Sequence, residues 1–354
     1  MRLIGIISAL LIGIAALSGC ERNQPVYNSR FLAFGTLTNL SIVGVPREKA
    51  EQASSAIEDD FQYMHNAWHA WQQGPLSRTN VLLQEGVRFS VPPSVLKLIK
   101  ISRDLENKSD HLFNPAIGKL IKLWGFQKDE LSNQRPPDAQ EIKKLVTAQP
   151  SMDDIRIDGI YAQCSNPAVQ LDFGAIGKGY GIDLAIEHLK EMGIHNAIIN
   201  AGGDLRAIGS RSGHPWRIAI RSPSGAGTLG FVHIRGDESV FTSGNYERNY
   251  LWKGKFYHHI IDPRTGYPAE GTRSVTVIHD NAAEADAAAT ALFIAGPKDW
   301  RRIAKRMGIR YVLLVDEQNI IHMNPAMQKR VQLIGDNLHV RISAPLTNAK
   351  SKTH

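Results

Sequence analysis

The feature that most constrains this chain is a glycine-rich segment near its middle, residues 171–183, with the sequence LDFGAIGKGYGID. It places Asp172 and Lys178 among four glycines, where we expect an extended segment to turn into a helix. Glycine lets the backbone approach a ligand closely and adopt positive φ, and a helix N-terminus presents free N–H groups to anionic oxygens. The segment therefore predicts a nucleotide or phosphate site. The competing interpretation is a tight turn held by a local salt bridge between the two side chains.

The N-terminus has the pattern of a secretory signal. Arg2 precedes an apolar run over residues 3–17, which is shorter than the ~20 residues that a membrane-spanning helix needs. Cys20 follows directly after Leu-Ser-Gly, as at a lipoprotein cleavage site. We expect residues 1–19 to be a signal peptide, Cys20 to become the lipidated first residue, and residues 20–30 to form a polar tether. An uncut membrane anchor is the alternative.

Charge and cysteine content exclude several classes of protein. Lys and Arg number 41 against 34 Asp and Glu, a net charge of +7, but the basic residues are scattered, so nucleic-acid binding is not expected. Only Cys164 remains after processing, so an internal disulfide is excluded and we expect this cysteine to be structural. The chain has no CxxC or HExxH pair, so a zinc site is not expected.

Helical and strand patterns are mixed along the chain. Alternating residues predict a strand over 31–43, and apolar residues at helical spacing predict a long helix over 47–71. Two further helices are expected over 282–294 and 297–307. Because strands and helices do not alternate regularly, the pattern favours an α+β fold of mixed sheets with flanking helices. The expected domain covers residues 31–345 and the expected disordered tail covers residues 346–354.

An alanine-rich segment carries two oxygen ligands at helical spacing. Asp286 and Thr290 stand four residues apart, so their side chains project from one face of the expected helix. One carboxylate and one hydroxyl suit a magnesium ion whose shell is completed by water, backbone carbonyls and phosphate. The competing interpretation is that Asp286 favours the helix dipole and that Thr290 is buried among alanines.

Two adjacent histidines precede a turn. His258 and His259 lie in an expected strand that runs into the sequence DPRTG at 262–266, with proline at the second position of the turn. Adjacent strand residues point to opposite faces, so only one of the two histidines can meet a ligand. A neutral imidazole can accept the proton of an attacking hydroxyl or orient a phosphate.

With the glycine-rich segment, four further segments make the chain resemble the ApbE family of flavin transferases. They are FNPAIGKLIKLWGF at 113–126, NAGGD at 200–204, HHIIDPRTG at 258–266 and ADAAATA at 285–291. Five motifs in this order are far more specific than any one of them. The resemblance runs from about residue 34 to about residue 314. It implies an ApbE-like, T-fold-like α+β fold.

The resemblance also implies roles for individual residues. The residues at the family's flavin-binding positions are Phe34, Trp71, Phe113, Asn114, Asp172, Lys178 and Ile260. Those at its magnesium-binding positions are Asp286, Thr290 and, through backbone atoms, Ala175 and Ala289. His259 matches the family's histidine before the Asp-Pro turn and is the expected catalytic residue. The proton acceptor itself is left open between His259, Asp262 and a metal-bound water.

Several positions depart from the family pattern. Asn114 stands where the family has aspartate, so a negative charge is absent there while hydrogen bonding to adenine or ribose is retained. Phe34 stands in place of methionine, and Asn245 stands where aspartate is expected. The loop that contains Trp68 and Trp71 is longer than the family's.

The activity that the resemblance implies is that of a magnesium-dependent FAD:protein FMN transferase. Such an enzyme splits FAD, attaches FMN to a threonine or serine of a periplasmic or membrane acceptor protein and releases AMP. The implied acceptors are flavoprotein subunits of respiratory sodium-pumping quinone reductase or Rnf-type complexes. The implied location is the periplasmic face of the inner membrane, held by the lipid on Cys20. The alternatives are an FAD pyrophosphatase that gives FMN and AMP, and a non-catalytic FAD-binding lipoprotein.

Overall fold

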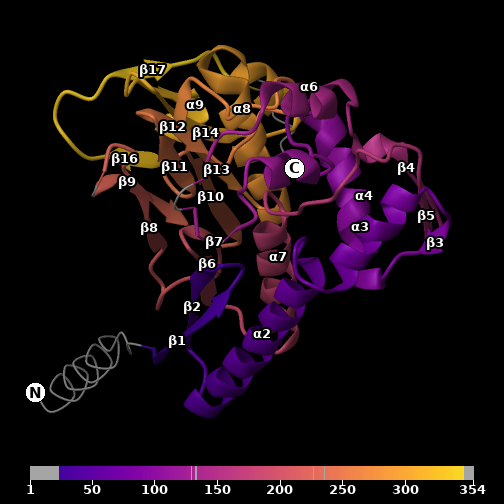
Figure 1. Ribbon diagram of the computed structural model, residues 1–354. Helices are drawn as coiled ribbons and strands as arrows, with labels where there is room; N and C mark the ends of the chain where they lie inside the picture. Colours follow the sequence, from indigo (N-terminus) through magenta and orange to yellow (C-terminus); the bar gives the residue numbers. More distant parts are fainter. Residues whose placement is uncertain (1–23, 129, 132–133, 226, 235, 347–354) are drawn as a thin grey trace, which may run out of the picture.

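The computed structural model describes residues 24–346, apart from 129, 132–133, 226 and 235 (Figure 1). The expected signal peptide with Cys20 therefore lies outside the described residues, as does the expected tail from residue 347 onward. Leu346, the first residue of that expected tail, is instead buried in the core. No helix of the described residues is both long enough and apolar enough to cross a membrane.

The structure contains helices and strands in mixed order. The helices are α2 (Arg47–Trp68), α3 (Pro75–Glu85), α4 (Pro93–Lys108), α5 (Gly118–Leu123), α6 (Ala139–Thr147), α7 (Gly177–Glu191), α8 (Ala282–Arg306) and α9 (Pro325–Gln328), with a 3-10 turn at Met152–Asp154. The first strands are β1 (Val26–Ala33), β2 (Thr36–Val43), β3 (Phe89–Ser90), β4 (Ile155–Asp158), β5 (Tyr161–Cys164), β6 (Ala197–Ala201), β7 (Asp204–Ile208), β8 (Trp216–Arg221) and β9 (Thr228–Ile234). The remaining strands are β10 (Glu238–Gly244), β11 (Asn249–Trp252), β12 (Lys255–His258), β13 (Thr272–His279), β14 (Tyr311–Asp316), β15 (Ile321–Met323), β16 (Val331–Leu333) and β17 (Val340–Ile342).

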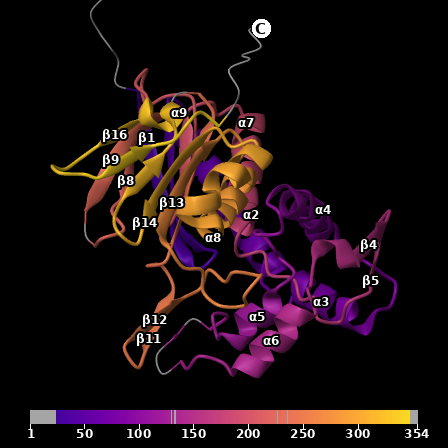
Figure 2. The ribbon, with the colours of Figure 1, turned by 90° about the horizontal axis from the view of Figure 1, so that it is seen from above.

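A nine-stranded sheet forms the centre of the molecule, in the order β1-β2-β6-β7-β10-β13-β14-β15-β17. Its neighbouring strands are antiparallel except β15 and β17, which are parallel. Helices α7 and α8 pack on one face of this sheet, and a three-stranded sheet, β16-β9-β8, covers the other (Figure 2). The α+β expectation is therefore confirmed.

Each face of the large sheet has its own hydrophobic core. The core on the helical side includes Phe61, Leu40 and Phe293, which are all fully buried. The core on the other side is smaller and joins the two sheets through residues such as Val232 and Ile278. Cys164 is buried in the first core, which confirms its structural role. Burial on both faces holds the strands rigid, so residues at strand ends are held in fixed positions.

A third, peripheral cluster carries the β11–β12 hairpin. Trp124, fully buried after α5, donates from its indole N–H to the carbonyl of Gly266 at 2.7 Å. Its ring lies 5.4 Å from that of Tyr257, and the ring of Phe126 lies 5.6 Å from that of Tyr250. The hairpin, α5 and α6 thus form one packed unit beside the helical layer (Figure 2).

Two expected boundaries were wrong. The strand expected over 31–43 is a hairpin of β1 and β2, because Phe34 and Gly35 adopt φ of 51° and 69° and reverse the chain. β1 already begins at Val26, inside the expected tether, because Val26 pairs in register with Val43. One other expected feature agrees with the structure. The break expected between residues 294 and 297 is present as Gly296, with φ of 68° and ψ of 179°.

Candidate active site

Close packing, and not an unusual backbone angle, explains Gly179 in the glycine-rich segment. None of the four glycines in residues 171–183 has a positive φ, so the expected positive φ was wrong. The residues directly before α7 form a turn, so the expected strand end was wrong as well. A Cβ on Gly179 would lie 2.3 Å from the carbonyl oxygen of Ala282. Glycine is therefore required because α7 meets the start of α8 backbone to backbone. We call residues 177–183 of α7 and 282–290 of α8 the helix junction.

Buried polar contacts fix the geometry of the helix junction. The Asp183 carboxylate on α7 accepts from the backbone N–H groups of Ala282 and Ala283, both at 2.9 Å. It thereby caps α8 from another helix, since the first N–H groups of a helix have no partner within it. Arg206 on β7 pairs with the same carboxylate and is itself buried. The first turn of α8 is thus fixed relative to α7 and β7.

Asp286 lies inside the helix junction. It is 6% exposed and accepts from the N–H of Gly179 at 2.9 Å. Burial raises the pKa of Asp286 to about 7, although the Lys178 ammonium favours its charged form. Four residues further along α8, the Thr290 hydroxyl is 3.2 Å from the Ser243 hydroxyl at the end of β10. The structure thus places the two predicted oxygen ligands four residues apart on α8, with Asp286 against the glycine-rich segment and Thr290 against the end of β10.

Lys178 does not pair with Asp172. Its ammonium contacts the carboxylate of Asp204 at the start of β7, and Asp204 also accepts from the N–H of Thr242 at 2.9 Å. Burial works against the ammonium charge, but Asp204 and Asp286 outweigh it and raise the pKa of Lys178. Residues 200–204 form one of the sequence motifs, but the motif alone assigns no partner to Asp204. The contact between Asp204 and Lys178 arises only because β7 packs against α7 in the folded protein.

A further carboxylate, Glu247, belongs to this cluster, although no sequence motif predicts it. Its side chain is exposed, but surrounding protein atoms limit the hydration of its carboxylate and raise its pKa to about 7. It lies close enough to Lys178, Asp204 and Asp286 for their charges to influence one another. It follows β10 in the stretch where the sequence showed Asn245 in place of an expected aspartate, and that was the available signal.

The donor set at the helix junction fits a magnesium ion. Asp286 and Thr290 supply oxygens from one helix face, and the neighbouring carboxylates of Asp204 and Glu247 create negative charge that Lys178 offsets only in part. Hard divalent cations prefer such oxygen donors. Among the described residues no group of three or more His, Cys, Asp or Glu side chains is arranged around a metal position. The predicted magnesium ligands do not require such a group, because they are one carboxylate, one hydroxyl and backbone atoms of Ala175 and Ala289.

Asp172 precedes α7 and faces the aromatic loop. Its carboxylate accepts from the N–H of Gly174 at 2.7 Å and from the side chain of Trp71. Burial raises the pKa of Asp172, and these hydrogen bonds oppose the shift. The structure thus brings Asp172 and Trp71 together, as expected for two residues of one binding surface.

The two histidines differ in environment, and β12 ends between them. His258 is 5% exposed; its Nε2 is 2.8 Å from the Ala269 carbonyl, and its Nδ1 accepts from the N–H of Ile260. His259 is only half-buried, and its Nδ1 is 3.2 Å from the Arg248 carbonyl. Because a carbonyl can only accept, Nδ1 of His259 carries the hydrogen and Nε2 keeps a free lone pair. Withdrawal from water, together with the adjacent His258, lowers the pKa of His259 to about 3.

The Asp-Pro turn is structural. Asp262 is 7% exposed and accepts from the backbone N–H and the guanidinium of Arg264. Its backbone carbonyl accepts from the N–H of Gly266 at 2.8 Å. With its carboxylate occupied in this way, Asp262 is a poor candidate for the proton acceptor.

Other residues at the family's flavin positions have mainly packing contacts. Phe113 is 1% exposed and Ile260 is 5% exposed, so their side chains belong to the core. Asn114 donates to the Pro150 carbonyl and accepts from the N–H of Ala116, each at 2.8 Å, which holds its turn. Phe34 stacks on Trp68 with ring centroids 6.0 Å apart. Flavin contacts by these residues stay predictions.

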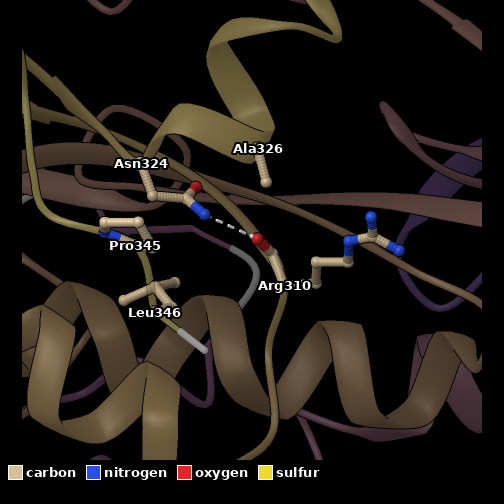
Figure 3. A pocket seen from close by; sticks show the side chains of 5 residues that line it. All are labelled: Arg310, Asn324, Ala326, Pro345 and Leu346. Atoms are coloured by element: carbon tan, nitrogen blue, oxygen red, sulfur yellow. Dashed lines mark hydrogen bonds between the residues drawn. The ribbon is translucent and has the colours of Figure 1, made fainter. Parts of the chain in front are cut away.

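Two hollows lie outside this group of residues. One, of about 110 Å³, is lined by Arg310, Asn324, Ala326, Pro345 and Leu346 (Figure 3). Asn324 spans it by donating to the Arg310 carbonyl at 2.8 Å. The other, of about 250 Å³, lies between α2, α4 and α7 and includes Trp68 and Tyr180. Neither includes a residue predicted to bind flavin or metal, and the active-site assignment therefore rests on the polar contacts.

Comparison with known proteins shows which family the chain is similar to. A sequence model of the ApbE family matches residues 34–313. A Rhodobacter capsulatus protein named FAD:protein FMN transferase is 42% identical over 314 residues, which cover 88% of this chain but 59% of that protein. A Klebsiella pneumoniae protein of the same name is 28% identical, covering 93% of this chain and 97% of that protein. The crystal structure of the ApbE protein from Thermotoga maritima superposes with a TM-score of 0.79 at 30% identity, covering 86% of this chain and 99% of that one.

Proposed function

The chain belongs to the ApbE family, and from that premise we propose that it is a magnesium-dependent FAD:protein FMN transferase. The observation that carries the proposal is the charged cluster at the helix junction, where Lys178 meets Asp204 beside the buried Asp286. An ammonium at a helix N-terminus suits the pyrophosphate of FAD. The chemistry is attack by a threonine or serine hydroxyl on the phosphorus of the FMN half, with AMP leaving together with the bridging oxygen.

Magnesium would be held by Asp286 and Thr290, with backbone atoms of Ala175 and Ala289. When bound, it supplies positive charge to the pyrophosphate oxygens. Lys178 binds the same oxygens from the start of α7, and Asp204 keeps it protonated. Asp172 and Trp71 would hold the flavin or ribose part through the N–H acceptor and the aromatic face that they provide.

His259 is the proposed proton acceptor. Its free Nε2 can accept the hydroxyl proton, while Nδ1 stays tied to the Arg248 carbonyl. A pKa of about 3 makes it a weak base in the protein alone. A bound anionic pyrophosphate would raise this pKa, because a nearby negative charge favours the imidazolium.

The test is incubation of the protein with FAD and magnesium, with and without an acceptor domain from a sodium-pumping or Rnf-type complex. Transfer predicts covalent flavin on the acceptor and one AMP per flavin attached. Free FMN and AMP regardless of acceptor would instead identify an FAD pyrophosphatase. Unchanged FAD in both reactions would leave only flavin binding.

Residues 1–20 support a proposal for location. We propose that Cys20 carries a lipid that holds the enzyme at the periplasmic face of the inner membrane, where membrane acceptor subunits are within reach. Cys20→Ser should release the protein from membranes without loss of transfer activity, since the proposed chemistry begins at Phe34. A Ser variant that stays in the membrane fraction after signal cleavage would exclude lipidation as the anchor.

A further inference from the structure

Asn80 on α3 is a buried amide whose two hydrogen bonds both go to the backbone of one distant residue. Its Nδ2 donates to the carbonyl of Leu171 at 2.9 Å, and its Oδ1 accepts from the N–H of the same residue at 2.7 Å. Asn80 is 3% exposed and Leu171 is fully buried. We call this pair of hydrogen bonds the amide clamp. Because a buried polar group is costly without a partner, the clamp holds α3 and Leu171 in one fixed relation.

The amide clamp takes the place of a neighbouring strand. In an extended segment, successive residues direct their N–H and C=O groups to alternate edges. Gln170 and Asp172 donate their N–H groups to main-chain carbonyls of residues 115–116, at 3.1 Å and 2.9 Å. Leu171, which lies between them, directs its N–H and C=O to the other edge, where Asn80 pairs with both. The segment is thus held from both edges.

Asp172 depends on how this segment is held. Its carboxylate accepts from the N–H of Gly174 at 2.7 Å and from the side chain of Trp71. Because Asp172 directly follows Leu171, a shift of Leu171 would move the carboxylate relative to both partners. Residues that contact a ligand are placed precisely only where further hydrogen bonds behind them hold them in position.

The start of α3 holds the aromatic loop, residues 69–74. Within this loop, Nδ1 of His69 accepts from the N–H of Trp71 at 3.2 Å and from that of the next residue at 3.0 Å. The N–H of Gly74 donates to the Ser77 hydroxyl on α3 at 2.9 Å. The loop that carries Trp71 is therefore joined to the same helix that carries the amide clamp.

We propose that Asn80 is a positioning residue for flavin binding, whose amide clamp sets the aromatic loop with Trp71 against Asp172. This inference rests on the proposed function, in which Trp71 and Asp172 hold the flavin or ribose part of FAD, and it adds the residue that keeps the two in place. Asn80 acts through these two residues, since its own side chain is buried against the backbone. A site that is organised before the ligand arrives binds it at lower entropic cost.

The first test is a double-mutant cycle on FAD affinity, measured by titration of flavin fluorescence. Asn80→Ala leaves the N–H and carbonyl of Leu171 buried without these partners, and we expect the Kd for FAD to rise by about tenfold. In the Asp172→Ala background the same substitution should change the Kd by less than about threefold, because the carboxylate that it positions is absent. A role in general stability would instead give the same factor in both backgrounds.

The matched control is Asn324→Ala. Asn324 is 2% exposed and also bonds two main-chain groups: it donates to the Arg310 carbonyl at 2.8 Å (Figure 3) and accepts from the N–H of Val312 at 3.3 Å. It lies outside the proposed site. Its loss should lower the free energy of unfolding, as the loss of Asn80 does, but leave the Kd for FAD unchanged.

Asn80→Asp keeps the size of the side chain and tests the clamp should the alanine variant fail to fold. An ionised carboxylate can only accept a hydrogen bond, whereas a protonated carboxyl group can accept and donate as the amide does. Burial raises the pKa of a carboxyl group, so protonation is expected on mild acidification. The Kd for FAD, divided by the wild-type Kd at the same pH, should be about tenfold at pH 8 and fall toward unity at pH 5.5. A ratio that is equal at both pH values contradicts the need for both hydrogen bonds.

The outcomes separate the positioning role from the proposed function. An unchanged Kd in Asn80→Ala, an equal factor in the two backgrounds, or an equal rise in Asn324→Ala overturns the positioning role alone. A wild-type Kd in Asp172→Ala also overturns it, because Asn80 would then have no flavin contact to position. Normal cycle results without FMN transfer to any acceptor overturn the transferase proposal and leave the positioning role intact. A wild-type protein that does not bind FAD overturns both.

Discussion

The helix junction and the β11–β12 hairpin meet at one site but are built in opposite ways. At the helix junction, two backbones touch at Gly179, and the carboxylates of Asp183 and Asp286 are buried and paired with N–H groups. The hairpin buries only its inner aromatic face and exposes Leu251 and Phe256. The helix junction, which holds charges in fixed positions, thus lies beside a hairpin that exposes apolar side chains.

The difference follows from what each region has to hold. Buried charges are stable only when every group has a partner, so the helix junction requires tight packing and a defined set of hydrogen bonds. The hairpin places one half-buried histidine beside an accessible surface and needs no buried ion pair to do so. We therefore expect substitutions in the helix junction to affect catalysis and folding, and substitutions at the base of the hairpin to affect the proton acceptor.

The largest expected effect is that of Asp286→Ala on catalysis. Loss of this carboxylate should reduce FMN transfer by about 10³-fold, a magnitude seen when one strong electrostatic contact to the reacting group is removed. Magnesium affinity, measured by titration calorimetry, should fall with it, while circular dichroism stays native. Glu191→Ala, at the exposed end of α7 and outside the helix junction, should leave both unchanged. A variant that transfers FMN at the wild-type rate without excess magnesium would remove Asp286 from the metal site.

His259→Ala tests the hairpin side of the comparison. Single-turnover transfer should slow by about 10²-fold, since loss of a general base costs 10²- to 10⁴-fold, while the Kd for FAD changes little. His258→Ala should mainly lower stability, because His258 is buried between the Ala269 carbonyl and the N–H of Ile260. Equal losses of transfer rate in both variants would contradict separate roles for the two histidines.

Gly179→Ala probes the packing of the helix junction. The added Cβ would lie 2.3 Å from the Ala282 carbonyl oxygen and 2.9 Å from the Cα of Ala283, so one backbone must move. We expect the free energy of unfolding to drop by about 2 kcal/mol, within the usual cost of overpacking. Gly181→Ala should cost less, because its nearest neighbour, 3.1 Å away, is the movable ring of Phe34. Chemical denaturation of both variants measures the difference, and a tolerated Gly179→Ala would show that the two helices can separate.

The smallest expected effect is the pH dependence caused by His258. Burial lowers the pKa of His258, and its Nδ1 already accepts the N–H of Ile260, so the folded state resists a second proton. Above pH ~6.5 both the folded and unfolded states hold this histidine neutral. Below that pH the unfolded state gains the proton first. The free energy of unfolding therefore decreases as the pH decreases, by at most about 1.4 kcal/mol per pH unit. Urea titrations at pH 7.5 and pH 5.5 measure this effect. Between these two pH values the free energy of unfolding of His258→Gln should decrease by about 1 kcal/mol less than that of the wild type. An identical pH dependence in both proteins would show that His258 is protonated in the folded state.

The sequence alone supported much of the site. The four-residue spacing of Asp286 and Thr290 placed both on one helix face, and the Lys178 position at the start of α7 followed from the helix pattern. These predictions succeeded because they depend on local periodicity. Asp204 and Glu247 were missed because their roles arise only when β7 and the end of β10 meet α7, and no local pattern encodes that contact.

What the sequence determined by itself, then, is the family, the α+β class and the residue types of the chemistry, because these follow from motif order and from period-2 and period-3.6 patterns. The tertiary structure decided the partners: Lys178 with Asp204, Asp183 with the start of α8, and Leu251 with Phe256 on an exposed face. It also gave Gly179 its reason, which is the contact between α7 and α8 and not a positive φ. Long-range contacts of this kind depend on how whole elements pack, so they appear only once the chain is folded.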